Sequence, residues 1–208
     1  MTSTATLVER LRRATHSGEP MRDIAVVVSE FIDDGGIELV DDPFHPARKD
    51  PAEGLVATLE SNEEVSVILI RSAPGLVAVP QRHEMPIAVG VLSGRIVVDV
   101  YLEDEGDHSL SGAGGVEVLP DEVYVIESDV VHNIRFVGND GLALHVIAGD
   151  LSSTIRTRWL DGHRQRLAPS TIYPLTALPM PLAESIESPS AGQQPATDGS
   201  DRPGTIEG

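Results

Sequence analysis

The stretch Gly75-Leu-Val-Ala-Val-Pro-Gln81-Arg-His83-Glu-Met-Pro-Ile87, which runs on to Gly94, is rich in β-type residues and carries a histidine near its end. A second stretch, Gly115-Val-Glu-Val-Leu-Pro-Asp-Glu-Val-Tyr-Val-Ile-Glu-Ser-Asp-Val-Val-His132, ends in the same way. Histidines from two separate strands can bind one metal ion when the strands lie side by side. The pair therefore predicts a β-rich fold with an imidazole site.

Strand geometry decides which side chains can share that site. Residues i and i+2 of a strand project to the same face, so Gln81 and His83 should point together. His132 begins an apolar strand, and a third histidine, His145, lies within the apolar segment 143–147. A single inward histidine is more often a hydrogen-bonded core residue than a ligand. Three histidines on apolar faces, one of them two residues after a glutamine, favour a functional site instead.

Most of the chain after residue 54 consists of short β-type runs separated by turn residues. This spacing is typical of a sandwich or barrel, and the absence of long helices between the runs argues against a parallel α/β sheet. Turns are expected at Ser93-Gly94, at Ser111-Gly-Ala-Gly-Gly115 and at Gly138-Asn-Asp-Gly141. The predicted strands are 65–70, 86–92, 95–102, 122–126, 132–137 and 142–148. Together these patterns predict an all-β fold.

The two ends of the chain differ from this β-rich centre. Residues from about 4 to 31 have helical apolar spacing, and Gly18-Glu-Pro20 splits them into two helices. Residues 152–167 are expected to contain a short helix with Trp159 packed on the barrel. The tail is rich in Ser, Pro, Gly and acidic residues, which predicts disorder. The predicted segments are a helical extension (1–45), a β-barrel (46–160), a C-terminal extension that packs on the barrel (161–182) and a disordered acidic tail (183–208).

Composition narrows the classes of function. The 208 residues carry a formal net charge of −18, which disfavours nucleic acid and anionic membrane surfaces as partners. The chain has no cysteine, so any metal must be held by His, carboxylate, amide or water. The N-terminus lacks the pattern of a signal peptide, and no apolar run approaches the roughly 20 residues that span a bilayer. We therefore expect a soluble cytoplasmic protein.

The spacing within the first stretch is similar to a known motif. Five residues separate Gly75 from Gln81, three separate His83 from Ile87, and six separate Ile87 from Gly94. This arrangement resembles the first motif of the cupins, G-x5-H-x-H-x3,4-E-x6-G. The resemblance implies the cupin fold, a double-stranded β-helix or jelly-roll barrel.

The second stretch and the segment after it extend this resemblance. Pro120 and His132 resemble parts of the second cupin motif, with a longer interval between them. The phrase Leu144-His-Val-Ile-Ala-Gly-Asp-Leu151 is similar to the closing signature of the thiol dioxygenases. That branch of the cupins includes cysteine dioxygenase and 3-mercaptopropionate dioxygenase. The resemblance covers about residues 46–160.

The resemblance implies a metal site with named ligands. His83 and His132 take the positions of two Fe(II)-binding histidines, and Gln81 takes the position of the third. Fe(II) is the expected metal, and Ni, Zn, Cu or Mn are alternatives. His145 matches the histidine of a catalytic Ser-His-Tyr relay. Arg156 falls near the arginine that binds the substrate carboxylate in the mercaptopropionate branch.

Further side chains are candidates because of their place in the pattern. Arg71 could enter the cavity as a substrate-binding residue or cap a sheet edge. Tyr124 could offer its hydroxyl as a catalytic group or pack in the core. Arg156 and Arg158 lie in a polar run, so a solvated helix face is the alternative to a substrate role.

Two classes of function agree with these observations. The first is a metal-dependent oxygenase-like enzyme that acts with O2 on a small anionic substrate, with thiol-containing acids among the candidates. The second is a metal-free cupin that binds a small ligand or serves as a regulatory module, for which the glutamine at position 81 is the motivation. An isomerase or lyase on the same scaffold is a further option, since a fold does not fix chemistry. The expected partners are a small molecule and, through exposed strand edges, a second copy in a homodimer.

Overall fold

The computed structural model describes residues 3–36, 55–72, 76–137, 141–168 and 177–179. Gly75, most of the predicted turn at 138–141 and the predicted tail lie outside these ranges. The predicted start of the barrel at residue 46 also lies outside them, and its predicted end at residue 160 falls at the turn between two paired strands.

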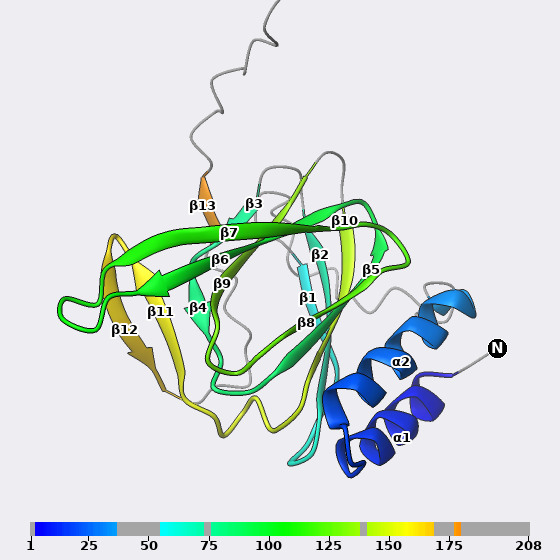
Figure 1. Ribbon diagram of the computed structural model, residues 1–208. Helices are drawn as coiled ribbons and strands as arrows, with labels where there is room; N and C mark the ends of the chain where they lie inside the picture. The colour runs from blue at the N-terminus through cyan, green and yellow to red at the C-terminus, as the bar shows by residue number, and fades with distance from the viewer. Residues whose placement is uncertain (1–2, 37–54, 73–75, 138–140, 169–176, 180–208) are drawn as a thin grey trace, which may run out of the picture.

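The strands form two antiparallel sheets (Figure 1). The first sheet contains, in spatial order, β1 (Leu55–Ser61), β2 (Ser66–Ser72), β10 (Gly141–Ile147), β5 (Ile87–Ser93) and β8 (Val123–Ile126). The second sheet contains, in spatial order, β12 (His163–Leu167), β11 (Arg156–Leu160), β4 (Gln81–Arg82), β9 (Val131–Phe136), β3 (Leu76–Ala78) and β13 (Ala177–Pro179). Two more strands join the second sheet through β9, namely β6 (Ile96–Glu103) and its partner β7 (Leu110–Val118).

The way the chain crosses between the sheets identifies the architecture. It leaves the first sheet after β5, forms β6 and β7 in the second, returns for β8, crosses again for β9 and ends the barrel with β10. The spatial orders are therefore β2-β10-β5-β8 in one sheet and β4-β9-β6-β7 in the other. Eight strands connected in this way form a jelly roll, the double-stranded β-helix of the cupin fold. The predicted fold class is confirmed, and all six predicted strands are present with no end shifted by more than two residues.

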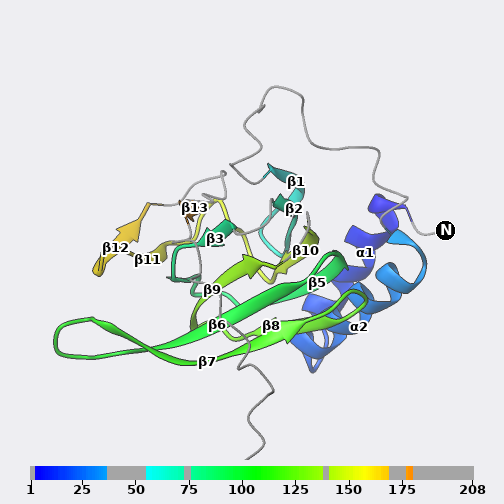
Figure 2. The ribbon, with the colours of Figure 1, turned by 90° about the horizontal axis from the view of Figure 1, so that it is seen from above.

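Two helices cover the outer face of the first sheet, as Figure 2 shows. The helix α1 (Thr4–Thr15) begins where the Ser3 hydroxyl accepts a hydrogen bond from the Thr6 N–H at 3.2 Å. The helix α2 (Pro20–Asp33) begins with a proline, whose fixed φ suits the first helical position. The predicted split at Gly18-Glu-Pro20 is confirmed. Among the described helices, none combines the length and the apolar character needed to cross a membrane.

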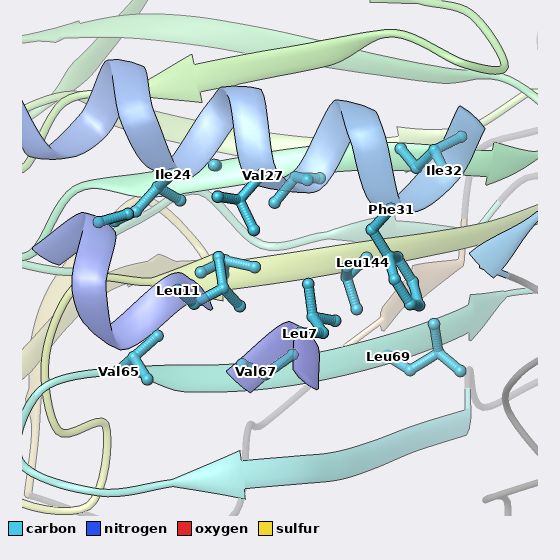
Figure 3. Packing of buried hydrophobic residues seen from close by; sticks show 14 of the residues in the cluster. Leu7, Leu11, Ile24, Val27, Phe31, Ile32, Val65, Val67, Leu69 and Leu144 are labelled. Atoms are coloured by element: carbon cyan, nitrogen blue, oxygen red, sulfur yellow. The ribbon is translucent and has the colours of Figure 1, made fainter. Parts of the chain in front are cut away.

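Apolar side chains from both helices pack on the sheet (Figure 3). Leu7 and Leu11, one helical turn apart, are completely buried. The helices pack in one cluster with outward side chains of the first sheet, which include Val67, Leu69, Ala88, Leu142, Leu144 and Val146. Gly90 of β5 allows α2 to approach closely, because a Cβ there would lie 2.6 Å from Val28 Cγ1 and 2.8 Å from Ile32 Cδ1.

A second apolar cluster fills the space between the two sheets. Alternate residues of the same strands point inward, so Ile68 and Ile70 of β2 belong to this cluster while their neighbours face the helices. Both sheets contribute to it, and its other members include Ile87, Val89, Val91, Ile96, Val98, Ile134 and Phe136. The inner faces of the sheets thus form an apolar interior.

The helix predicted within residues 152–167 is wrong, because residues 156–167 form the hairpin of β11 and β12. The two strands are joined by Asp161 and Gly162, whose φ angles are +52° and +76°. An Asp-Gly pair with positive φ at both positions is the two-residue turn that β-hairpins prefer, and it overrides the polar composition. Trp159 is nevertheless buried, at 3% exposure.

The turn predicted at 111–115 is also wrong. These residues belong to β7, which pairs only with β6 among the described strands. Most of β7 is exposed. A larger side chain in place of its glycines would therefore bury little surface, so glycine costs the strand little packing energy. The chain reverses instead at 104–109, where Asp104 Oδ1 accepts hydrogen bonds from the N–H groups of Gly106 and Asp107.

Candidate functional site

Four buried polar side chains predicted as site residues belong to the barrel interior. His132 lies on β9 and is the register partner of Gln81 on β4, and His83 follows β4 directly. His145 lies on β10 in the opposite sheet, with Val89 as its partner on the inward face of β5. Each of the four side chains is at most 5% exposed. Strand alternation, applied to segments far apart in the sequence, therefore places all four away from solvent.

The rings of His83 and His132 lie side by side. Their centroids are 5.4 Å apart and their planes are tilted by 31°. His132 Nδ1 lies 3.2 Å from the Val130 carbonyl oxygen, and because a carbonyl can only accept, Nδ1 carries the proton. The ring lone pair is then on Nε2, which is buried and has no hydrogen-bond partner among the described residues. A neutral imidazole with an available Nε2 lone pair is the form that binds metal ions.

Burial keeps the three interior histidines uncharged at neutral pH. It lowers the pKa of His132 to about 4, against a smaller opposing effect of the hydrogen bond to Val130. It lowers the pKa of His145 to about 3, and nearby His132 adds to this shift. The pKa of His83 also lies well below its usual range, first because of burial and then because of the charges of His132, Arg156 and His145. Because Arg156 and His145 both lower the pKa of His83, they interact electrostatically with it.

Arg156 brings a permanent positive charge to the interior. Strand β11 pairs with β4 so that Arg158 is the register partner of Gln81, and Arg156 lies two residues away on the same face. Arg156 is 1% exposed, and its charge lowers the pKa of His83. Arg158 is half-buried, and its Nε donates a hydrogen bond to Gln165 Oε1 at 3.0 Å. Guanidinium groups bind carboxylates through two parallel hydrogen bonds, so this face of β11 is suited to an anion.

The donor set fits a metal ion through two imidazoles and one amide. Within the part of the chain that the structure describes, no three His, Cys, Asp or Glu side chains are grouped to hold one ion. His83 and His132 are nevertheless neutral and adjacent, and Gln81 lies in register with His132. An amide oxygen is a harder and weaker ligand than an imidazole nitrogen. The three residues therefore suit a first-row divalent ion that keeps several positions for water or substrate.

Of the two other candidate residues, Tyr124 faces the interior and Arg71 does not. Tyr124 is the register partner of Val89 and packs against the inner apolar cluster. Arg71 has the strand parity of Leu69, which faces the helices, and its side chain is exposed. Strand alternation thus turns Arg71 away from the barrel interior, against the expectation that it binds substrate there.

The outer side of β4 carries an ion-pair cluster around one carboxylate. Arg82, which lies between two residues of the site but points outward, donates from Nη1 to Glu103 Oε2 at 3.0 Å. Glu103 Oε1 also lies 2.8 Å from His108 Nδ1 and 3.5 Å from Arg164 Nε. Three separate segments therefore meet on Glu103.

The position of Arg158 beside Gln81 is a feature that the sequence interpretation missed. The polar run from 156 to 166 was compatible with a solvated helix face, whereas the structure pairs it as two strands. Asp161-Gly162 was the signal that could have revealed the hairpin, and with it the common face of Arg156 and Arg158.

No protein-family model matches the chain, and no curated protein matches it. Solved structures with a similar strand arrangement include oxalate decarboxylase from Bacillus subtilis, which is 14% identical, with 55% of this chain and 28% of that chain covered and a TM-score of 0.40. The 11S globulin from Wrightia tinctoria, whose structure reveals an auxin binding site, is 14% identical, with 58% of this chain and 31% of that chain covered and a TM-score of 0.45. The match thus spans less than a third of either protein. No chemistry follows from likenesses at this level.

Proposed function

We propose that this protein is a metal-dependent enzyme on a cupin barrel, acting with O2 on a small anionic substrate. The observation that carries the proposal is the pair of buried, neutral imidazoles of His83 and His132. His132 Nε2 has no hydrogen-bond partner among the described residues. A buried polar nitrogen without a partner costs free energy, and a metal ion at that atom would offset the cost.

Each interior residue has a role in this proposal. His83, His132 and Gln81 would hold Fe(II), with Ni, Zn, Cu or Mn as alternatives. A bound ion of this kind supplies Lewis acidity and, in the case of iron, one-electron chemistry. Arg156 would bind a carboxylate of the substrate on the side of His83. His145, with a pKa of about 3, is too weak a base to accept a proton at pH 7, so it would orient a polar group of the substrate instead.

The apolar lining limits what the interior can accept. Ile68, Val89 and Tyr124 contribute to the inner cluster, so a substrate there is small and largely shielded from water. A short acid that bears a thiol satisfies both ends of the site, because sulfur is a soft ligand for a transition metal and the acid group suits Arg156. Such acids are the first substrates to test.

Metal content tests the proposal directly. Protein purified without chelators should contain a near-stoichiometric first-row metal by elemental analysis, and His132→Ala should lower that content by about tenfold or more. His163→Ala removes an exposed histidine and is the matched control that should keep the metal. Oxygen uptake by the Fe(II)-loaded protein, with cysteine and 3-mercaptopropionate as probes, then tests the reaction. A wild-type protein without metal after Fe(II) reconstitution would refute the proposal.

A non-catalytic binding module is the second candidate. It is favoured by the amide at position 81, since three strong metal ligands are not grouped among the described side chains. On this hypothesis the barrel interior, with Arg156 and its apolar side chains, binds a small acid without transforming it. The discriminating result is tight binding of a small acid by metal-free protein together with no oxygen uptake when iron is supplied.

A further inference from the structure

Strand β7 forms a long margin of the second sheet (Figure 2). It contains nine residues and pairs only with β6 among the described strands. Its residues from Ser111 to Glu117 are all exposed, so their side chains are open to solvent. A strand at the edge of a sheet presents backbone N–H and C=O groups to which a further strand can bind. β7 is therefore a surface on which the sheet can be extended.

The two margins of the second sheet differ in charge. At the opposite margin, β12 carries exposed arginines at positions 164 and 166. Charged side chains of this kind keep an edge strand from pairing with another strand. β7 carries a single charged residue, Glu117, and contains neither lysine nor proline. Its edge thus lacks the protection by charge that β12 has.

Every carboxylate of β6 and β7 is paired with an arginine. The pairs are Glu117–Arg95, Asp99–Arg135 and Glu103–Arg82, with N–O distances of 2.9, 2.8 and 3.0 Å. These two strands are therefore locally neutral, although the chain has a formal net charge of −18. A large charge of one sign keeps copies of a protein apart. Two copies of this chain would approach most easily at a surface where the acidic side chains are already neutralised.

Exposed apolar side chains gather on the same two strands. Among the described residues, four large apolar side chains are exposed, and three of them are Leu102 of β6, Val116 of β7 and Leu119, which follows β7 directly. Val116 is the register partner of Val98, and Leu102 has the strand parity of Val98, so Leu102 and Val116 lie on one face. Removing these side chains from water would favour association.

We propose that β7 pairs with β7 of a second copy of this chain, antiparallel and about a two-fold axis at Val116. Such pairing joins the same surface on both copies and closes after two. A bulge leaves Ala113 without a partner on β6, so we expect regular pairing over residues 114–118. With the axis at Val116, Glu117 faces Gly115 of the second copy. An axis at Glu117 would instead place two carboxylates opposite each other, which destabilises paired strands.

The mass of the protein in solution tests this proposal. Light scattering after size exclusion, on protein freed of metal so that no ion can bridge two copies, should give twice the chain mass of 22.2 kDa. Val116→Lys places two ammonium groups opposite each other and should raise the dimer dissociation constant by about tenfold or more over a dilution series. Val26→Lys adds the same charge at an exposed valine of α2 and should leave the dimer unchanged. Circular dichroism verifies that both variants are folded.

Disulfide crosslinking tests the position of the axis. The chain has no cysteine, so one introduced thiol can be linked only to its equivalent in a second copy. Val116→Cys should form a linked dimer under mild oxidation, because directly opposite residues of antiparallel strands lie about 4.5–5.5 Å apart between Cα atoms. Gly112→Cys has open space for its side chain, and should stay unlinked because its equivalent would lie several residues away along the paired strands.

Three results would overturn the proposal. The first is a wild-type protein that stays monomeric at high micromolar concentration, which is also what binding of an unrelated strand at this edge would give. The second is a dimer that Val116→Lys does not weaken, or that Val26→Lys weakens equally. The third is a disulfide that forms with Gly112→Cys and not with Val116→Cys.

Discussion

Acidification should destabilise this protein through its buried histidines, and His145 gives the cleanest case. The ordinary pKa of 6.5 falls to about 3 in the folded state because of burial. The unfolded chain therefore binds a proton at pH values where the folded protein does not. The contribution of His145 to stability is complete above pH 6.5, declines as the pH falls from there, and is lost once the pH passes below about 3.

The size of the effect follows from the two pKa values. Between pH 8 and pH 5, proton uptake by His145 in the unfolded state lowers the free energy of unfolding by about 2 kcal/mol. His132, with a folded pKa of about 4, adds a similar loss of about 2 kcal/mol over the same interval. Together they should remove a large part of the 5–15 kcal/mol that is typical of a domain of this size.

Urea unfolding of metal-free protein at pH 8 and at pH 5 measures this loss. His145→Leu places an apolar side chain among the apolar residues of the inner cluster, and the decrease between the two pH values should be smaller than in the wild type by about 2 kcal/mol. His163→Leu, at an exposed position, should leave the decrease as it is in the wild type. If His145→Leu loses stability as steeply as the wild type, His145 is not held neutral by burial and the reasoning is wrong.

Three further predictions concern the scaffold. Gly90→Ala places a methyl group 2.6 Å from Val28 Cγ1 and should destabilise the protein by about 1–3 kcal/mol in urea unfolding; an unchanged midpoint would show that α2 does not pack this tightly. Leu11→Ala empties a fully buried position between α1 and the first sheet and should cost about 2–5 kcal/mol in the same assay, while the exposed Val26→Ala should cost far less. Gly162→Ala forces a positive φ on a side chain and should cost about 1 kcal/mol. Hydrogen exchange should then rise in β11 and β12, and uniform exchange across the barrel would contradict the hairpin turn.

Much of the interior could be predicted because strand alternation is a local rule. Residues i and i+2 of a strand lie on the same face. The apolar residues two positions away from His83, His132 and His145 therefore predicted that these histidines point inward. The same rule could not decide which face of the first sheet the helices cover, and Arg71 was misplaced for that reason. Which face is inside depends on packing between distant segments, and no single strand carries that information.

The errors in secondary structure have a common physical origin. Residues 111–115 and 152–167 are polar or glycine-rich, and their pattern carries little hydrophobic periodicity. Most of these residues form strands because neighbouring strands offer backbone hydrogen bonds: β7 pairs with β6, and β11 pairs with β4. Local composition cannot report a partner that lies tens of residues away.

The carboxylate of Glu103 is connected to the barrel interior through strand β4. On the outer side of β4, Arg82 forms an ion pair with Glu103. The preceding residue of the same two-residue strand, Gln81, points inward. Higher ionic strength or a substitution at Glu103 would therefore weaken the ion pair of Arg82 and, through the same short strand, change how firmly Gln81 is held in the interior.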